Sequence, residues 1–254
     1  MRRATGNDGP GPRPVSSGFG PPAQTVAGTG AGRAAPRLRD RRRGIEMSED
    51  SVDEKHEFPH WEELYQEREI ESLPWFNPKL DEDLENALGE LALRGGSALD
   101  LGAGPGTQAI HLASRGFDVT ATDISVAAIR LASEKARKHG IEITWEQDDI
   151  LDTRLDRQFD LIFDRGCFHV LDPERRMDYV RVVSGLLNIG GYLFLKCFSR
   201  SQPGEEGPYR FTPEQIRNIF GGRLSVLSIK ETVYQGTLDP LPRALFCTMR
   251  RDRR

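Results

Sequence analysis

The chain has 254 residues, a net charge of −4, 37% hydrophobic and 29% charged residues, and this balance is typical of a globular protein with one sizeable core. None of its apolar runs approaches the roughly 20 residues needed to span a bilayer, and its three cysteines, Cys167, Cys197 and Cys247, show no CxxC or Cys/His ligand spacing. We therefore expect a soluble cytoplasmic protein with no structural zinc, no disulfide framework and no membrane partner.

The charge is divided unevenly along the chain. Residues 1–46 hold nine arginines, no lysine and three acids, a net charge of +6, and the remainder carries −10. The first segment is rich in Gly, Pro, Ala and Ser and too poor in large apolar residues to form a core, so we expect a disordered extension. Its "RLRDRRR" run is typical of an arm that binds nucleic acid or a membrane surface. Met47, however, begins a stretch that looks like a natural protein start, and the extension would then not be native.

Residues 47–96 predict an N-terminal helical lid segment. The sequence "FPHWEELYQEREIESLPWFNPKLDEDLENALGELAL" suggests helical segments broken at Pro74 and Pro78, the second over 79–93, and Gly95–Gly96 closes it. Trp75 and Phe76 are either an aromatic lid over a cationic ligand or ordinary core residues.

Strand and helix patterns alternate from residue 97 to 250. We expect strands at 97–101, 117–122, 141–146, 159–163, 190–198, 223–234 and 243–249, and helices at 106–115, 125–139, 173–187 and 212–220. Short connections between such elements predict an α/β fold, a doubly wound, seven-stranded, mostly parallel sheet with helices on both faces. The last two strands have no helix between them, so one of them is expected to be antiparallel.

The stretch "ALDLGAGPGTQ", Ala98 to Gln108, joins the first strand to the first of these helices. Glycines at 102, 104 and 106 let the backbone turn sharply and approach a ligand closely. A dinucleotide loop would read G-x-G-x-x-G, but here Thr107 stands at its third glycine position. The acid Asp100 beneath the loop fits a cationic ligand better than a pyrophosphate.

Two further acids follow the next two strands. Asp123 ends the second strand, where an acid can accept hydrogen bonds from ribose hydroxyls or cap the helix that begins after Ser125. Asp148 and Asp149, in "WEQDDILD", follow the third strand. The occurrence of acids after three successive strands is a more specific sign of a binding site than any one of these acids.

This ordered set resembles the cofactor site of class I S-adenosylmethionine-dependent methyltransferases, and the resemblance implies S-adenosylmethionine as the cofactor. It implies that Asp100 lies near the amino-acid moiety of the cofactor and that Asp123 binds the ribose. It also implies that Asp149, or Asp148 as the alternative, binds the adenine amino group, with Ile150 packing on the ring. We expect the remaining cofactor contacts at Gly102, Ala103, Gly104, Ile124 and Asp164.

The segment after the fourth strand points to a branch of this family. The [DN]-P-P-[YF] tetrad of amino-methylating enzymes is absent, and "DRG" at 164–166 resembles the thiopurine S-methyltransferase branch, which includes tellurite-resistance and halide or thiol methyltransferases. "WEELYQEREIESLPW" and "EGPYRFTPEQIRNIFG" resemble other segments of that branch. The resemblance implies methyl transfer to a small molecule: a thiol, a reduced chalcogen or a halide.

Other functions stay open at this point. A phenol or quinol is the nearest competing acceptor, and the chain could also be a cofactor-binding regulator without turnover. An RNA methyltransferase recruited by the arginine arm is disfavoured, because nucleic-acid binding depends on clustered positive charge and residues 47–254 are acidic.

Catalytic candidates lie directly after the fourth strand. His169 is a possible general base with a pKa near neutrality, or a histidine packed under a loop. Arg165 would orient an anionic substrate or stabilise a thiolate, or else pair with Asp164 or another acid. Cys167 is not expected to act as a nucleophile, because direct transfer needs no covalent enzyme intermediate. We expect four further residues to flank the acceptor, namely Lys196, Cys197, Tyr209 and Arg210.

Overall fold

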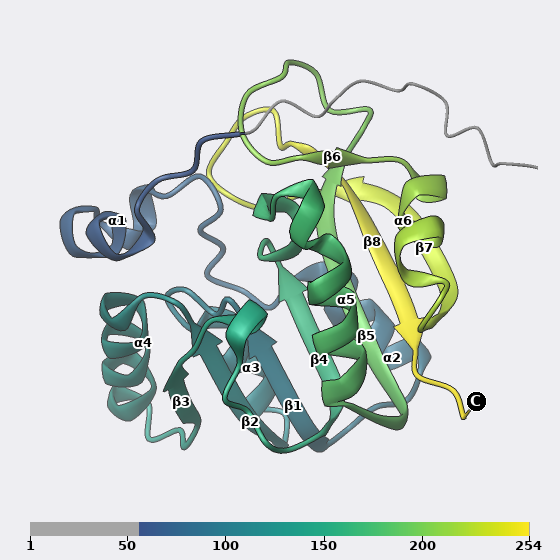
Figure 1. Cartoon of the computed structure of the whole chain (residues 1–254). Coiled ribbons are helices and arrows are strands. Elements are labelled where there is room, and N and C mark those ends of the chain that lie inside the picture. Colours follow the sequence, from purple (N-terminus) through teal and green to yellow (C-terminus); the bar gives the residue numbers. More distant parts are fainter. Residues whose placement is uncertain (1–55, 254) are drawn as a thin grey trace, which may run out of the picture. The chain divides into compact units, whose positions relative to one another are not determined.

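The computed structural model describes residues 56–253 and shows one sheet with helices on both faces (Figure 1). The strands are β1 (Gly96–Leu101), β2 (Phe117–Asp123), β3 (Thr144–Gln147), β4 (Phe159–Arg165), β5 (Leu187–Ser199), β6 (Arg210–Phe211), β7 (Ser225–Val233) and β8 (Arg243–Arg250). Their order is β3-β2-β1-β4-β5-β8-β7, with the short β6 paired to β5. The extension predicted for 1–46 lies outside the described residues.

The direction of the strands confirms the predicted fold class. Strand β8 is antiparallel to β5 and to β7, and the other pairs are parallel. A doubly wound, mostly parallel sheet with one antiparallel strand near the C-terminus is therefore confirmed. The eighth strand, β6, was not predicted, because two residues carry no periodic pattern.

The helices are close to those expected. They are α1 (Trp61–Glu67), α2 (Glu82–Glu90), α3 (Thr107–Ala113), α4 (Val126–Lys138), α5 (Arg176–Leu186) and α6 (Pro213–Phe220), with 3₁₀ turns η1 (Ile70–Ser72), η2 (Ile150–Asp152), η3 (Phe168–Val170) and η4 (Pro173–Arg175). Helix α2 is shorter than predicted, because Asp81 caps it by accepting from the Asp83 N–H and Ala92 leaves helical geometry with φ 52°.

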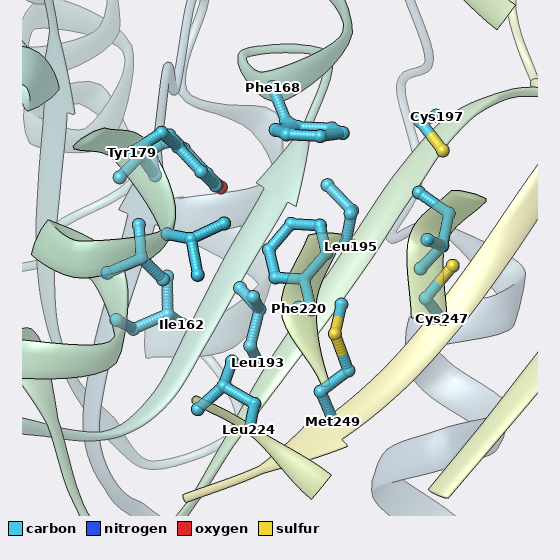
Figure 2. Close-up of a cluster of buried hydrophobic side chains, with 14 of the residues drawn as sticks. Ile162, Phe168, Tyr179, Leu193, Leu195, Cys197, Phe220, Leu224, Cys247 and Met249 are labelled. Carbon is cyan, nitrogen blue, oxygen red and sulfur yellow. The ribbon is translucent and has the colours of Figure 1, made fainter. Parts of the chain in front are cut away.

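Side chains that alternate along the strands divide the core between the two faces of the sheet. Leu193 and Leu195 on β5 belong to an apolar cluster with α5 and α6, whereas Phe194 between them packs in a cluster with α2 and α3. Figure 2 shows the first cluster, where Phe220 of α6 and Met249 of β8 meet these leucines.

The glycine loop after β1 is packed on both sides by protein atoms. Gly102, Gly104 and Gly106 all have positive φ, at 66°, 50° and 74°. A Cβ at Gly104 would lie 2.7 Å from the Tyr65 hydroxyl of α1, and one at Gly106 would lie 2.6 Å from the Trp145 ring. Packing of the loop between neighbouring elements therefore requires these glycines, in addition to any approach of a ligand.

We predict that Gly106→Ala destabilises the fold by about 2–4 kcal/mol, because the new Cβ combines left-handed strain with overpacking. The control is Gly89→Ala in α2, where a Cβ would meet nothing within 4 Å, and helix propensity favours alanine by up to about 1 kcal/mol. Urea unfolding of both variants measures the difference. Equal midpoints for the two would contradict this account of the loop.

Candidate functional site

A cavity of about 820 Å³ opens at the carboxyl ends of the central strands. Its floor is formed by residues at the ends of β1, β2, β3 and β4, and its walls come from segments near residues 57–65, 74–77, 202–210 and 234–242. Ligands of doubly wound sheets bind at this edge, beside the point where the strand order reverses. The volume lies in the upper part of the range of about 300–1,000 Å³ for small-molecule sites.

Asp100 is a buried carboxylate on the cavity floor, with 2% of its surface exposed. Its Oδ2 accepts from the Ala109 N–H at 2.8 Å. Burial raises its pKa to about 7, and the negative charge of Asp123 adds to the rise. A cation bound beside it would therefore be stabilised by the carboxylate and would favour its ionised form.

Asp123 holds two backbone segments together at the same floor. One carboxylate oxygen accepts from the Gly104 N–H at 2.8 Å and the other from the Ser125 N–H at 2.9 Å. The cap of α4 is supplied by the Ser125 hydroxyl, which accepts from Ala128. Asp123 thus positions the glycine loop and still lines the cavity, next to the half-exposed side chain of Ile124.

The two acids after β3 have different tasks. Asp148 is buried and accepts from the Thr153 hydroxyl and the Arg154 N–H, so it holds its own turn. Asp149 is exposed, and one oxygen accepts from the Leu151 N–H at the start of η2. Both residues and Ile150 line the cavity. The exposed carboxylate of Asp149 is the more available of the two to a ligand.

Asp164 is not among the residues that line the cavity, contrary to the expectation that it contacts the cofactor. Its side chain is fully buried and accepts from three backbone N–H groups, those of Gly166, Cys167 and Phe168, and from the Tyr179 hydroxyl. With four donors around it, this carboxylate fixes the turn after β4. The sequence placed Asp164 at the correct end of the sheet but could not show which way its side chain points.

Arg165 binds the walls of the cavity together. Its Nε donates to Asp81 at 2.9 Å, Nη1 donates to the Trp75 carbonyl at 3.1 Å, and Nη2 donates to the Gln235 carbonyl. The guanidinium also lies 4.4 Å from the centre of the Tyr234 ring. Arg165 therefore forms the salt bridge that was one of the two expectations for it, and its partner is Asp81, not Asp164.

Asp81 supports the cavity wall through Arg165, a contact that the sequence did not predict. It is fully buried, and its carboxylate also pairs with Lys196 at 2.8 Å. Burial by itself would raise the pKa of Asp81, but Lys196 and Arg165 together hold it below its usual value. Only its helix-capping position is visible in the sequence, because its partners lie 84 and 115 residues away.

Of the other residues expected beside the acceptor, only Arg210 lines the cavity. Lys196 is enclosed by Asp81, Asp83 and Gln235, and Cys197 points into the core on the α5 and α6 side. Tyr209 is 3% exposed and is not part of the cavity wall. The strand alternation sends Lys196 and Cys197 to opposite faces of the sheet, away from its edge.

Aromatic side chains line the cavity in two groups. Trp75 and Phe76 pack near Tyr65 of α1, and Phe198 and Tyr234 form an edge-to-face pair. His169 lies beside the second pair, 4% exposed, with its ring stacked on Tyr234 and edge-on to Phe198. Burial, with a smaller effect of the Arg165 charge, lowers the pKa of His169 to about 3. The expectation of a histidine that titrates near neutrality is therefore wrong, and this ring stays neutral.

Across residues 56–253, no group of three or more His, Cys, Asp or Glu side chains is placed to hold a metal ion. None of the helices in that range is long and apolar enough to cross a membrane.

Comparison with known proteins gives several matches. A family model described as "Methyltransferase domain" matches residues 98–191. An uncharacterised methyltransferase of Schizosaccharomyces pombe is 32% identical over 108 residues, which cover 41% of this chain and 73% of that protein. The thiopurine S-methyltransferase of Vibrio vulnificus is 39% identical over 64 residues, 25% of this chain and 30% of that protein. The crystal structure of TehB from Haemophilus influenzae has a TM-score of 0.58 at 21% identity, covering 68% of this chain and 63% of that one.

We predict that the affinity for S-adenosylmethionine rises about 20-fold from pH 5.5 to pH 7.5, because the cation binds the ionised form of Asp100. In the absence of a bound cation, the raised pKa of Asp100 has the opposite consequence: the protein becomes less stable as pH rises. The native state keeps a proton that the unfolded chain releases near pH 4, so the free energy of unfolding falls as pH rises towards about 7.

Titration calorimetry across this pH range tests the effect. Asp100→Asn should bind weakly and with no pH dependence, whereas Asp118→Asn, at an exposed position on β2, should behave as the wild type. A pH-dependent Asp100→Asn variant would contradict the assignment.

We also predict that Asp81→Asn lowers the free energy of unfolding by about 3–5 kcal/mol, because it leaves Lys196 and Arg165 buried without their shared partner. Asp118→Asn is the matched control, since it removes the acid from an exposed arginine pair whose typical worth is about 0–1 kcal/mol. Denaturant unfolding measures both. Similar losses in the two variants would refute the importance of the buried pair.

Proposed function

The chain belongs to the class I S-adenosylmethionine-dependent methyltransferases, as its motifs predicted, and we propose that its methyl acceptor is a small aromatic thiol. The observation that carries this proposal is the burial of His169 and Tyr234 among aromatic rings beside the cavity. Burial disfavours the charged forms of such groups, so the proposed acceptor is one that is nucleophilic without an enzyme base.

Three groups on that side are relevant. Burial lowers the pKa of His169 to about 3, and it raises the pKa values of Cys167 and Tyr234 above their usual ranges. None of these groups accepts a proton readily near neutral pH. The acidic side chains at the outer rim, such as Glu205 and Glu206, are exposed to solvent. An acceptor that is already ionised needs no help from them.

The nature of the wall supports an aromatic acceptor over a small inorganic one. Trp75, Phe76, Phe198 and Tyr234 provide flat apolar surfaces suited to stacking on a ring. A halide or a small chalcogen anion would leave most of such a wall without contacts. The guanidinium of Arg165, the nearest charge to this wall, is already engaged by Asp81, Trp75 and Gln235.

The residues of the chain fit the cofactor and divide the work of the reaction. Asp100, Asp123 and Asp149 would hold S-adenosylmethionine on the acidic side, and the glycine loop would lie beneath it. When bound, the cofactor supplies a methyl group on a sulfonium, an electrophile that needs no further activation. The protein positions the acceptor in line and excludes water. Bound S-adenosylmethionine would supply the methyl group to a thiolate whose proton has gone to solvent, so that one S–C bond would form as another breaks and a neutral thioether would remain.

Transfer of labelled methyl groups to a panel of acceptors tests the proposal. The panel holds thiophenols, hydrogen sulfide, reduced selenite or tellurite, iodide, phenols and hydroquinones. At saturating S-adenosylmethionine, which removes the pH dependence of cofactor binding, we expect thiophenols to react, with kcat/KM rising tenfold per pH unit up to the pKa of each thiol and then levelling off. A plateau set by the acceptor and not by the enzyme is the result expected when no enzyme base takes part.

Other outcomes redirect the proposal. Transfer to phenols alone would establish O-methylation, and cofactor binding without transfer to any acceptor would favour a regulator. Transfer to iodide in preference to thiophenols would overturn the argument from the aromatic wall.

A further inference from the structure

The hydrogen bond of His169 fixes which ring nitrogen carries the proton. The backbone N–H of Phe198 donates to Nδ1 at 3.2 Å. A backbone N–H is always a donor, so Nδ1 must be the unprotonated nitrogen. The neutral ring then carries its hydrogen on Nε2, and this assignment follows from the donor alone.

Nε2 has no hydrogen-bond partner among residues 56–253, although His169 is 4% exposed. The residue lines the cavity beside Gly166, where a Cβ would come within 3.3 Å of Nε2. Nε2 is not among the fully buried polar atoms that lack a partner in the described residues, so this nitrogen is accessible from the cavity. A ligand with an acceptor atom at this place would accept its hydrogen.

We propose that His169 is a specificity-determining residue that donates its Nε2 hydrogen to the methyl acceptor and favours the acceptor's ionised form. The inference rests on the proposed function and gives this histidine a role opposite to that of a base. The chemistry it selects is an aromatic ring that bears a thiolate, or a ring nitrogen or carbonyl oxygen conjugated with one, because negative charge on these atoms strengthens the hydrogen bond.

The groups around the ring are consistent with a fixed donor. Phe198 and Tyr234 enclose it from β5 and from the end of β7, and Tyr234 donates its hydroxyl hydrogen to the Arg165 carbonyl. The charged group in this environment is Arg165, whose positive charge disfavours protonation of the ring. Cys167 on the same turn is held neutral by burial. A neutral donor thus persists across the working pH range.

Two substitutions separate the two nitrogens. His169→Asn keeps an oxygen near Nδ1 to accept from Phe198 but has no donor at Nε2. His169→Gln places an amide N–H near Nε2 but has no acceptor near Nδ1. His139→Asn is the control, because His139 is exposed beyond the end of α4. A histidine that served only to pack or to satisfy Phe198 would be replaced better by Asn.

The readout is the ionisation of a bound nitrothiophenol, whose thiolate absorbs visible light, titrated in the presence of S-adenosylhomocysteine so that no transfer occurs. In the wild type and the His139→Asn control we expect the bound thiol to ionise about one pH unit below the free thiol. His169→Gln should keep part of this shift and His169→Asn should lose it. In steady-state assays, His169→Asn should raise KM for the thiol about tenfold with unchanged affinity for S-adenosylmethionine.

Each outcome decides the proposal. A His169→Asn variant that shifts the thiol as the wild type does, or that outperforms His169→Gln, would overturn the donor role while leaving the thiol as the acceptor. Loss of all activity in His169→Gln but not of thiol ionisation would restore the histidine as a base. If the wild-type protein neither binds nor methylates any thiophenol, the proposed function and this inference fail together.

Discussion

The carboxylate of Asp81 is the contact on which the shape of the cavity depends. It caps the start of helix α2 and pairs with Lys196 near the end of β5 and with Arg165 at the end of β4. Through Arg165 the same carboxylate fixes the carbonyls of Trp75 and Gln235, which belong to two different wall segments. A buried pair of this kind adds little net stability, but removal of one partner is costly. The main effect of the network is therefore on the geometry of the wall, and its net contribution to the free energy of unfolding is small.

The two sides of the cavity differ in charge for a physical reason. On the floor, burial raises the pKa values of Asp100 and Asp123, and the charge of Asp123 adds to the rise at Asp100. A cation bound there would offset this cost. On the aromatic side, burial acts on His169, Cys167 and Tyr234, and it removes charge from all three. One side is thus suited to a sulfonium cofactor, and the other to an acceptor whose charge the protein does not have to create.

Helix α1 contacts the start of α4, the glycine loop and the segment around Trp75. Glu62 accepts from the Ser125 hydroxyl and from the Ala127 N–H at the start of α4, while the Tyr65 hydroxyl lies against Gly104. The aromatic pair Trp61 and Trp75 then joins α1 to the wall beside the acceptor side. These contacts make the segment from α1 to Phe76 part of the cavity wall, and its two tryptophans line the cavity as well as contributing to packing.

The sequence by itself determined the order of the strands and helices, the family, and the presence of acids at the ends of β1, β2 and β3, which all line the cavity. These features are local, since each depends on an apolar period, a turn or an acid at the end of one strand. Only the tertiary structure decided the roles of Asp81, Asp164, Arg165 and His169. Their functions depend on which side chains face them from 15 to 115 residues away, and on burial, which moves the pKa of His169 to about 3. Neither long-range contacts nor burial can be predicted from the local pattern of residues. The sequence therefore leaves His169 open as a base or a packed histidine, whereas the fold buries its ring and pairs Nδ1 with the Phe198 N–H.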